Sequence, residues 1–253
     1  MSTEALDTGI LLPAFAAGLL VLATHVPLGM QVLARGIVFL DLAIAQMAGL
    51  GVIAADLLGW EPQGWPAQAA ALAAAMLGAL LLTWSEKRWP EIQEALIGTI
   101  FVLAASLAIL LLARNPHGGE HLKDLLVGQI LWVNYAQLLT AALATAIILA
   151  VWLSMRGGRS GARFYLLFAA GVTVSVQLVG VYLVFASLIV PALATQHVRS
   201  GRLAVAYGVG AAGYALGLGM SALFDLPSGA VIVCDMALLA AAYAAFNEAR
   251  AAR

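Results

Sequence analysis

The chain alternates between long apolar runs and short stretches that hold most of its charged residues. A helix of about 20 apolar residues is long enough to cross the hydrocarbon core of a bilayer. Each run of this length therefore predicts one transmembrane helix. These runs cover approximately residues 10–30, 37–58, 65–84, 95–113, 135–155, 203–223 and 230–246.

The stretch from Gly171 to His197 does not fit this simple pattern. Together with the apolar residues 164–170 it is about one and a half times as long as a single span of ~20 residues, and it contains Gly180 and Pro191. Glycine permits unusual backbone angles and proline removes a backbone donor, so both favour a broken helix. Broken helices inside a membrane typically line a path for a substrate. We expect a broken or re-entrant segment near 171–198, with two ordinary helices and a tight turn as the alternative.

Composition supports a membrane protein without a separate soluble domain. The 253 residues are 63% hydrophobic and 10% charged, with a mean hydropathy of +0.99. No soluble core could bury so much apolar surface. We therefore predict an all-α integral membrane protein in which residues 1–253 form one bundle of about eight or nine transmembrane helices surrounded by the lipid bilayer. The basic residues are scattered, so a nucleic acid partner is not expected.

The distribution of Lys and Arg predicts the orientation, because short cytoplasmic loops are enriched in both. The basic positions expected inside are Arg35, Lys87, Arg88, the loop 156–163, Arg199, Arg202, Arg250 and Arg253. If the broken segment crosses twice, the chain makes nine crossings and begins outside, without a cleaved leader. If that segment dips and returns, eight crossings result and the C-terminus lies outside.

Few ionisable residues lie within the predicted spans, and each is a functional candidate because a charge in lipid is costly. Asp41 lies about one turn into the second span, and Gln46 follows five residues later, which is not the same helix face. Asp41 could bind a cation, or form a structural hydrogen bond with a neighbouring helix. Asp235 in the last span and His25 in the first have the same two interpretations.

The densest group of possible metal ligands lies after the fourth span, in the string NPHGGEH. His117, Glu120 and His121 offer two imidazoles and one carboxylate, which suit Zn²⁺ better than Mn²⁺. The string also contains H-x-x-E-H, a peptidase motif, but the adjacent Pro and Gly residues oppose the helix that peptidase chemistry needs. A solvated loop is the alternative. His197, at the end of the broken segment, is a further candidate cation ligand.

Four stretches together resemble the zinc and manganese ABC-type permeases. VGVYLVFASLIVPALATQ, DLPSGAVIV, LLVGQILWV and PLGMQVLARGIVFLDLAIAQMAGLG occur here in positions that correspond to motifs of that family. The resemblance covers most of residues 10–247. It implies a metal path through the membrane and supports Asp41 as a ligand.

Two features depart from the family pattern. The family commonly has Asp-x-x-x-His in its second span, whereas Ala45 follows Asp41 at that spacing and Gln46 comes one residue later. Gln46 is therefore only a candidate substitute ligand. In place of an acidic coupling helix before the broken segment, the chain has the short basic string RGGRSGAR.

The resemblance and the residues together predict a permease subunit of an ATP-driven importer in the bacterial inner membrane. The transported ion is expected to be zinc, with manganese as the alternative, and no permanently bound cofactor is expected. The sequence contains no G-x-x-x-x-G-K-[S/T] motif, so a cytoplasmic ATP-binding subunit should hydrolyse ATP. A periplasmic or lipid-anchored metal-binding protein and a second copy of the chain complete the expected assembly. A proton-driven transporter that uses Asp41 and Asp235 is the main alternative, and an intramembrane peptidase is a third.

Overall fold

The computed structural model describes residues 8–61, 64–113, 126–154, 161–198 and 200–251, and in these ranges the regular elements are all helical. Eight helices are long and apolar enough to cross a membrane. The predicted spans agree with the observed ones to within a few residues, so the all-α membrane fold is confirmed. The long helices are α1 (Thr8–Arg35), α2 (Leu40–Leu57), α3 (Trp65–Arg88), α4 (Gln93–Leu112), α6 (Tyr135–Ser154), α7 (Ala162–Val179), α9 (Arg202–Phe224) and α10 (Ser228–Ala251).

Three shorter helices complete the described elements. The 14-residue α8 (Val181–Ala194) follows α7 after a single residue. Two 3₁₀ turns, η2 (Pro90–Ile92) and η3 (Ile130–Trp132), precede α4 and α6. An ideal helix of 14 residues is only about 21 Å long, which is shorter than the ~30 Å hydrocarbon core.

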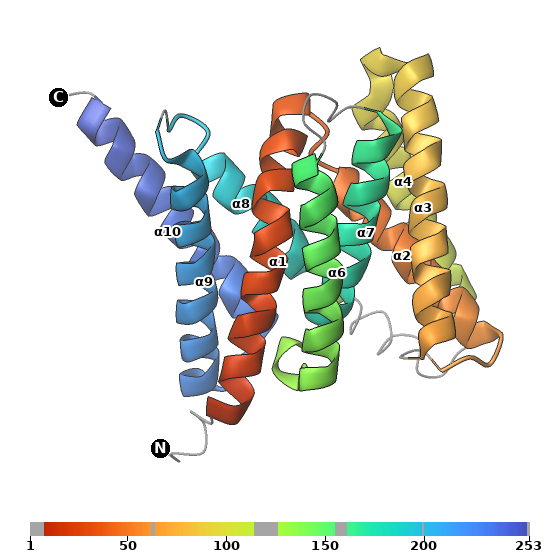
Figure 1. Cartoon of the computed structure of the whole chain (residues 1–253), viewed down its shortest axis with the longest axis horizontal. Helices are drawn as coiled ribbons and strands as arrows, with labels where there is room; N and C mark the ends of the chain where they lie inside the picture. The colour runs from red at the N-terminus through yellow and green to blue at the C-terminus, as the bar shows by residue number, and fades with distance from the viewer. Residues whose placement is uncertain (1–7, 62–63, 114–125, 155–160, 199, 252–253) are drawn as a thin grey trace.

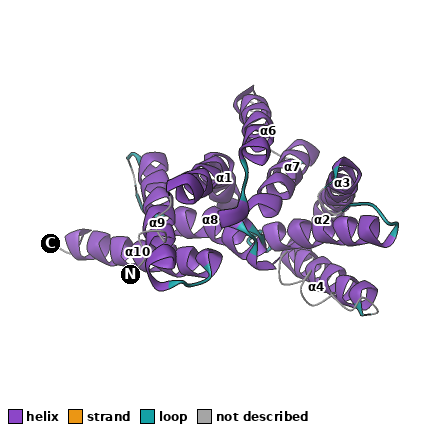
Figure 2. Ribbon diagram, turned by 90° about the horizontal axis from the view of Figure 1, so that it is seen from below, coloured by secondary structure: helices purple, strands orange, loops and turns teal. Residues whose placement is uncertain are grey.

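Helix α1 occupies the middle of the bundle, with α2, α3 and α4 on one side and α9 and α10 on the other (Figures 1 and 2). Small residues let α1 approach its neighbours closely, as is common in membranes. A Cβ atom on Gly29 would overlap the backbone carbonyl of Leu188 in α8, and one on Gly210 of α9 would approach the side chain of Leu22. The short α8 is thereby held directly against α1.

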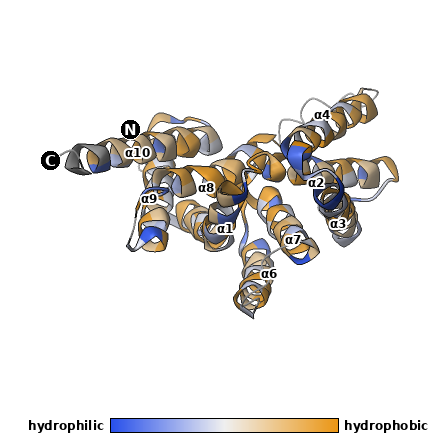
Figure 3. Cartoon of the chain, turned by 90° about the horizontal axis from the view of Figure 1, so that it is seen from above, coloured by the Kyte–Doolittle hydropathy of each residue, from blue (hydrophilic) through white to orange (hydrophobic). Residues whose placement is uncertain are grey.

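The outer faces of the helices are apolar, as a lipid environment requires. Leu110 of α4, Leu143 of α6 and Leu238 of α10 are each at least 60% exposed. Figure 3 shows that hydrophobic residues predominate along the helices.

Basic residues gather at one end of the bundle. Arg35 ends α1, Lys87 and Arg88 end α3, and Arg202 begins α9. All these helix ends lie at the top of Figure 1, as does the start of α7, whereas α1 begins at the bottom and α10 ends at the top. In the same view α7 runs downward and α8 runs back up, so the broken segment reverses direction at its break. Of these two helices only α7 is among the eight that are long enough to span a membrane, so the choice between nine and eight crossings stays a prediction.

The helix break lies at Gly180. This residue has φ 80° and ψ 165°, angles that are essentially restricted to glycine, and it separates α7 from α8. Pro191, which was also expected to break the chain, lies inside α8 without ending it. Proline removes the hydrogen bond of its own N–H group and crowds the carbonyl one turn before it, so its effect here is a local disturbance of the last turns of α8.

The backbone around Gly180 contacts two distant stretches of the chain. A Cβ atom on Gly180 would lie 2.6 Å from Cα of Gly128, which itself has φ 72°. A Cβ atom on Gly229, at the start of α10, would lie 2.8 Å from the carbonyl oxygen of Val127. Residues 126–133 lie against the helix break through Val127 and Gly128, and Ile130 is 1% exposed. Three of the four stretches that suggested the family therefore meet at one point.

Replacement of Gly180 by alanine should destabilise the protein by about 1–3 kcal/mol, because the backbone angles disfavour a Cβ and the added atom meets Gly128. Gly208→Ala is the matched control, since a Cβ there meets nothing within 4 Å. Thermal unfolding of the purified variants in detergent measures the difference. Equal midpoints for the two variants would show that the backbone contact at Gly180 is not tight.

Candidate functional site

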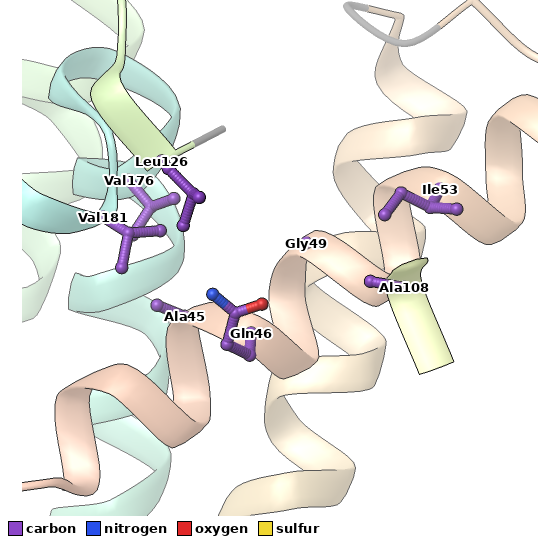
Figure 4. A pocket seen from close by; sticks show the side chains of 8 residues that line it. All are labelled: Ala45, Gln46, Gly49, Ile53, Ala108, Leu126, Val176 and Val181. Atoms are coloured by element: carbon purple, nitrogen blue, oxygen red, sulfur yellow. The ribbon is translucent and has the colours of Figure 1, made fainter. Parts of the chain in front are cut away.

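A small cavity of about 10 Å³ lies next to the helix break. It is bounded by α2, the end of α4, the start of the 126–133 stretch, and α7 and α8 on either side of Gly180 (Figure 4). Its volume corresponds to roughly one water-sized group. The lining residues are Ala45, Gln46, Gly49, Ile53, Ala108, Leu126, Val176 and Val181.

Gln46 is the polar side chain of this cavity lining. It is 8% exposed, and none of the hydrogen bonds among the described residues involves its amide. Figure 4 shows the amide directed into the space between α2 and the group formed by Leu126, Val176 and Val181. An amide without a partner in an apolar site is costly unless a ligand or a water molecule satisfies it. The cavity thus has the composition of a binding site with one polar group.

Asp41 lies on α2 about one turn before Ala45, nearer the basic end of the bundle, and is not itself part of the cavity lining. At about 100° per residue, Asp41 is rotated by roughly 40° from Ala45 and by roughly 140° from Gln46. Asp41 itself is 0% exposed, and neither of its carboxylate oxygens has a hydrogen-bond partner among the described residues. A buried carboxylate in this state needs either a proton or a cation.

Ala45 follows Asp41 by about one turn of α2. It lines the cavity at the position where the resembling family commonly carries histidine. A methyl group supplies no ligand there, so the neighbouring Gln46 is the side chain that brings oxygen and nitrogen atoms to the same space. The expectation that Asp41 and Gln46 do not stack on one face agrees with this placement.

The two other ionisable candidates lie on different helices. His25 in α1 is 0% exposed; its Nδ1 atom lies 3.0 Å from the carbonyl oxygen of Val21, and its Nε2 atom has no partner among the described residues. Asp235 in α10 is half-buried, and its Oδ2 atom is likewise without a partner there. Within the described ranges, no three His, Cys, Asp or Glu side chains are grouped so that they could hold a metal ion.

His197 and the NPHGGEH string have different positions relative to the cavity. His197 is exposed in the turn after α8, at the opposite end of that helix from Val181, so it is not part of the cavity lining. His117, Glu120 and His121 lie outside the described residues. Ala108 in α4 and Leu126, which come before and after that segment in the chain, both line the cavity.

The structure also contains a polar cluster that the sequence did not indicate. Gln93 at the start of α4 accepts a hydrogen bond of 2.9 Å from Ser85 Oγ of α3 and donates one of 3.4 Å to Tyr165 Oη of α7. The backbone amide of Phe39, just before α2, donates 3.2 Å to Glu94 Oε1. These contacts join α2, α3, α4 and α7 at the basic end. In the sequence, only the polar residues at the start of the fourth span indicated that such a cluster could form.

Comparison with solved structures shows a shared fold. PsaBC from Streptococcus pneumoniae, solved in complex with a Fab, contains a chain that is 22% identical, with a TM-score of 0.73 over 96% of this chain and 95% of that one. An ABC transporter assigned to the metal-chelate type, in an inward-facing conformation, is 18% identical, with a TM-score of 0.68 over 92% of this chain and 84% of that one.

Sequence comparison extends over the same length. The uncharacterized membrane protein slr2045 of Synechocystis sp. is 28% identical over 252 residues, which cover 91% of this chain and 88% of the relative. Residues 7–157 and 161–247 match the model of the ABC 3 transport family. That match spans nearly the whole chain and includes every helix described above. The chain is therefore a multi-pass membrane protein that belongs to the ABC 3 transport family.

Proposed function

We propose that the chain is the membrane permease subunit of an ATP-driven importer of divalent metal, and that zinc is its preferred ion. The observation that carries this proposal is Asp41, a fully buried carboxylate of α2 whose two oxygens have no hydrogen-bond partner among the described residues. A divalent cation can satisfy such a group. Membership of the ABC 3 transport family and the fold shared with a metal-chelate type transporter support a transport role.

The path of the ion would run along α2. An ion that enters from the end away from the basic residues would first meet the NPHGGEH string, with His117, Glu120 and His121 as transient ligands. It would next reach the cavity beside Gln46 and then Asp41, which lies about one turn before Ala45 on α2. Imidazole donors in the string favour zinc over manganese. Loose binding at each step suits a protein that must release its cargo.

The charge distribution supports the proposed orientation, and the missing nucleotide motif supports a separate ATP-binding subunit. The basic end would face the cytoplasm of a bacterium, with the protein in the inner membrane. A cytoplasmic ATP-binding subunit would dock there, near the 156–163 loop. A periplasmic or lipid-anchored metal-binding protein would deliver the ion at the other end, and two copies of the chain would form the transporter.

A proton-coupled secondary transporter is the second candidate. It is favoured by one observation, namely that Asp41 and Asp235 both have carboxylate oxygens without a partner among the described residues. Two carboxylates in different helices could carry protons in turn. Metal uptake that continues without an ATP-binding partner and collapses with the proton gradient would support this candidate over the first.

Replacement of Asp41 by asparagine should abolish metal uptake while membrane insertion continues, because a neutral amide is cheaper to bury than a charge but offers the cation no carboxylate. Uptake of ⁶⁵Zn²⁺ by cells that express the variant together with its ATPase measures this. Asp225→Asn is the matched control, since Asp225 is an exposed turn residue with φ 53°, which asparagine tolerates. Normal uptake by the Asp41 variant would remove Asp41 from the path.

Replacement of both His117 and His121 by alanine should weaken zinc uptake most at low external zinc and neutral pH. At acidic pH the variant and the parent should differ less, because protonation near the reference pKa of ~6.5 already empties imidazole ligands in the parent. The concentration dependence of uptake at two pH values gives the comparison. An unchanged dependence at neutral pH would mean that the string is only solvated surface.

The orientation gives a separate prediction. Ser160 lies in the basic 156–163 loop, so a cysteine at this position should resist membrane-impermeant thiol reagents added to intact cells and react after the cells are opened. Cysteine at Asp225, in the turn between α9 and α10, is the opposite control and should be labelled from outside. The native Cys234 is first replaced by alanine. Labelling of Ser160→Cys from outside would reverse the proposed orientation.

A further inference from the structure

Helix α8 begins inside the bundle, and its first backbone amides have no acceptor. Val184 N–H donates to Gly180 at 3.1 Å, but the N–H groups of Val181, Tyr182 and Leu183 have no hydrogen-bond partner among the described residues. Val181 and Leu183 are at most 3% exposed. The first amides of any helix lack partners within it and carry a partial positive charge. In lipid, water cannot readily compensate them.

The start of α8 and the amide of Gln46 belong to the same cavity. Val181, the first residue of α8, lines it from one side, and Gln46 lies opposite on α2 with its unpartnered amide directed into the space (Figure 4). Gln46 is 8% exposed, so it is nearly as buried as the helix start. Two independent features therefore border one cavity and have no hydrogen-bond partner among the described residues. They are the N-terminus of a 14-residue helix and a buried amide.

Both features can donate hydrogen bonds to an anionic oxygen. Helix N-termini bind carboxylates and other anions through free N–H groups and the helix dipole, and the NH₂ group of glutamine adds a neutral donor. A bare divalent cation would instead meet the positive end of α8. The cavity of about 10 Å³ has room for roughly one oxygen-sized group in this conformation.

We propose that this cavity is a subsite for a carboxylate oxygen that stays bound to the metal ion as it passes, so that the cargo is a metal–carboxylate complex. The inference rests on the proposed function, because it names the form in which the metal travels. In this arrangement the start of α8 and Gln46 hold the anionic ligand, and Asp41, one turn away along α2, faces the cation.

The sharpest variant removes one backbone donor without breaking the helix. Val181→Pro eliminates an N–H group at the first helical position, where proline is well tolerated, and the ψ of 165° at Gly180 suits a residue that precedes proline. Val181→Ala is the matched control, because it shortens the same side chain but keeps the N–H group. Gln46→Leu and Gln46→Glu test the opposite side of the cavity.

The experiment uses proteoliposomes that contain the permease and its ATPase. Uptake of ⁶⁵Zn²⁺ is measured at one fixed concentration of free zinc, with and without citrate, and entry of [¹⁴C]citrate is measured with and without zinc. The parent should take up zinc faster with citrate, and labelled citrate should enter only when zinc is present. The citrate-dependent rate of zinc uptake should fall about tenfold in Val181→Pro and in Gln46→Leu, whereas Val181→Ala should keep the rate of the parent.

Gln46→Glu gives an independent readout that a folding defect would not produce. Its side chain has nearly the size of glutamine, and its carboxylate would occupy the subsite permanently, so this variant should lose the citrate-dependent part of zinc uptake. Size-exclusion chromatography of every variant confirms that it is assembled.

The other outcomes overturn the inference. Zinc uptake in the parent that is equal with and without citrate at the same free zinc shows that the bare ion is the cargo, while the proposed function stands. Citrate entry without zinc shows a site for the free carboxylate. Equal behaviour of Val181→Pro and Val181→Ala removes the role of the α8 amides. No zinc uptake under either condition overturns the proposed function, and the inference with it.

Discussion

The arrangement of this protein depends on one constraint: a helix that ends inside a membrane leaves backbone groups that lipid cannot hydrogen-bond. The chain ends a helix in this way at Gly180. Part of the interrupted backbone is covered by other backbone, because Gly128 and Val127 lie directly against the break, and Gly229 approaches the same stretch. The missing Cβ atoms of Gly128, Gly180 and Gly229 allow this close contact. The backbone N–H groups at the start of α8, which have no partner among the described residues, border the cavity that Gln46 shares. The same break therefore accounts for the glycine contacts and for the polar cavity.

Much of the fold was predictable from the sequence because each span is a local property. The lengths of the apolar runs predicted seven of the eight long helices, and the broken segment predicted α7. The φ of 80° at Gly180 agrees with one of the two positions at which a break was expected. Pro191 shows the limit of this reasoning, since its effect depends on where it lies within α8. The contact of Gly128 with Gly180 could not be predicted, because it joins stretches that are far apart in the chain and depends on how α4, α6 and α7 pack.

The candidate site was predictable only in part, for a similar reason. Asp41 could be singled out because a carboxylate within an apolar run is rare, and its complete burial agrees with that interpretation. Gln46 was a weaker candidate, since helix geometry placed it on a different face from Asp41. The structure places Gln46, together with Ala45, in the cavity lining, whereas Asp41 lies about one turn before Ala45 and outside the lining. The position of His197 relative to the cavity required the path of α8, which no local pattern contains.

Helix α8 joins the two ends of the functional region. Its first residue lines the cavity, and its last turn lies at the basic end, where Arg202 donates a hydrogen bond of 3.3 Å to the carbonyl oxygen of Ala192 and Thr195 donates one of 2.8 Å to that of Pro191. These bonds satisfy carbonyl groups that a helix C-terminus leaves without partners, and the positive charge of Arg202 opposes the negative end of the dipole. Along its length, α8 is held to α1 by the contact at Gly29 and to α9 by a 2.9 Å hydrogen bond between Ser187 Oγ and Tyr214 Oη. Because a short helix fixed at several points moves as a unit, a displacement of the basic end would also shift Val181 and so change the shape of the cavity.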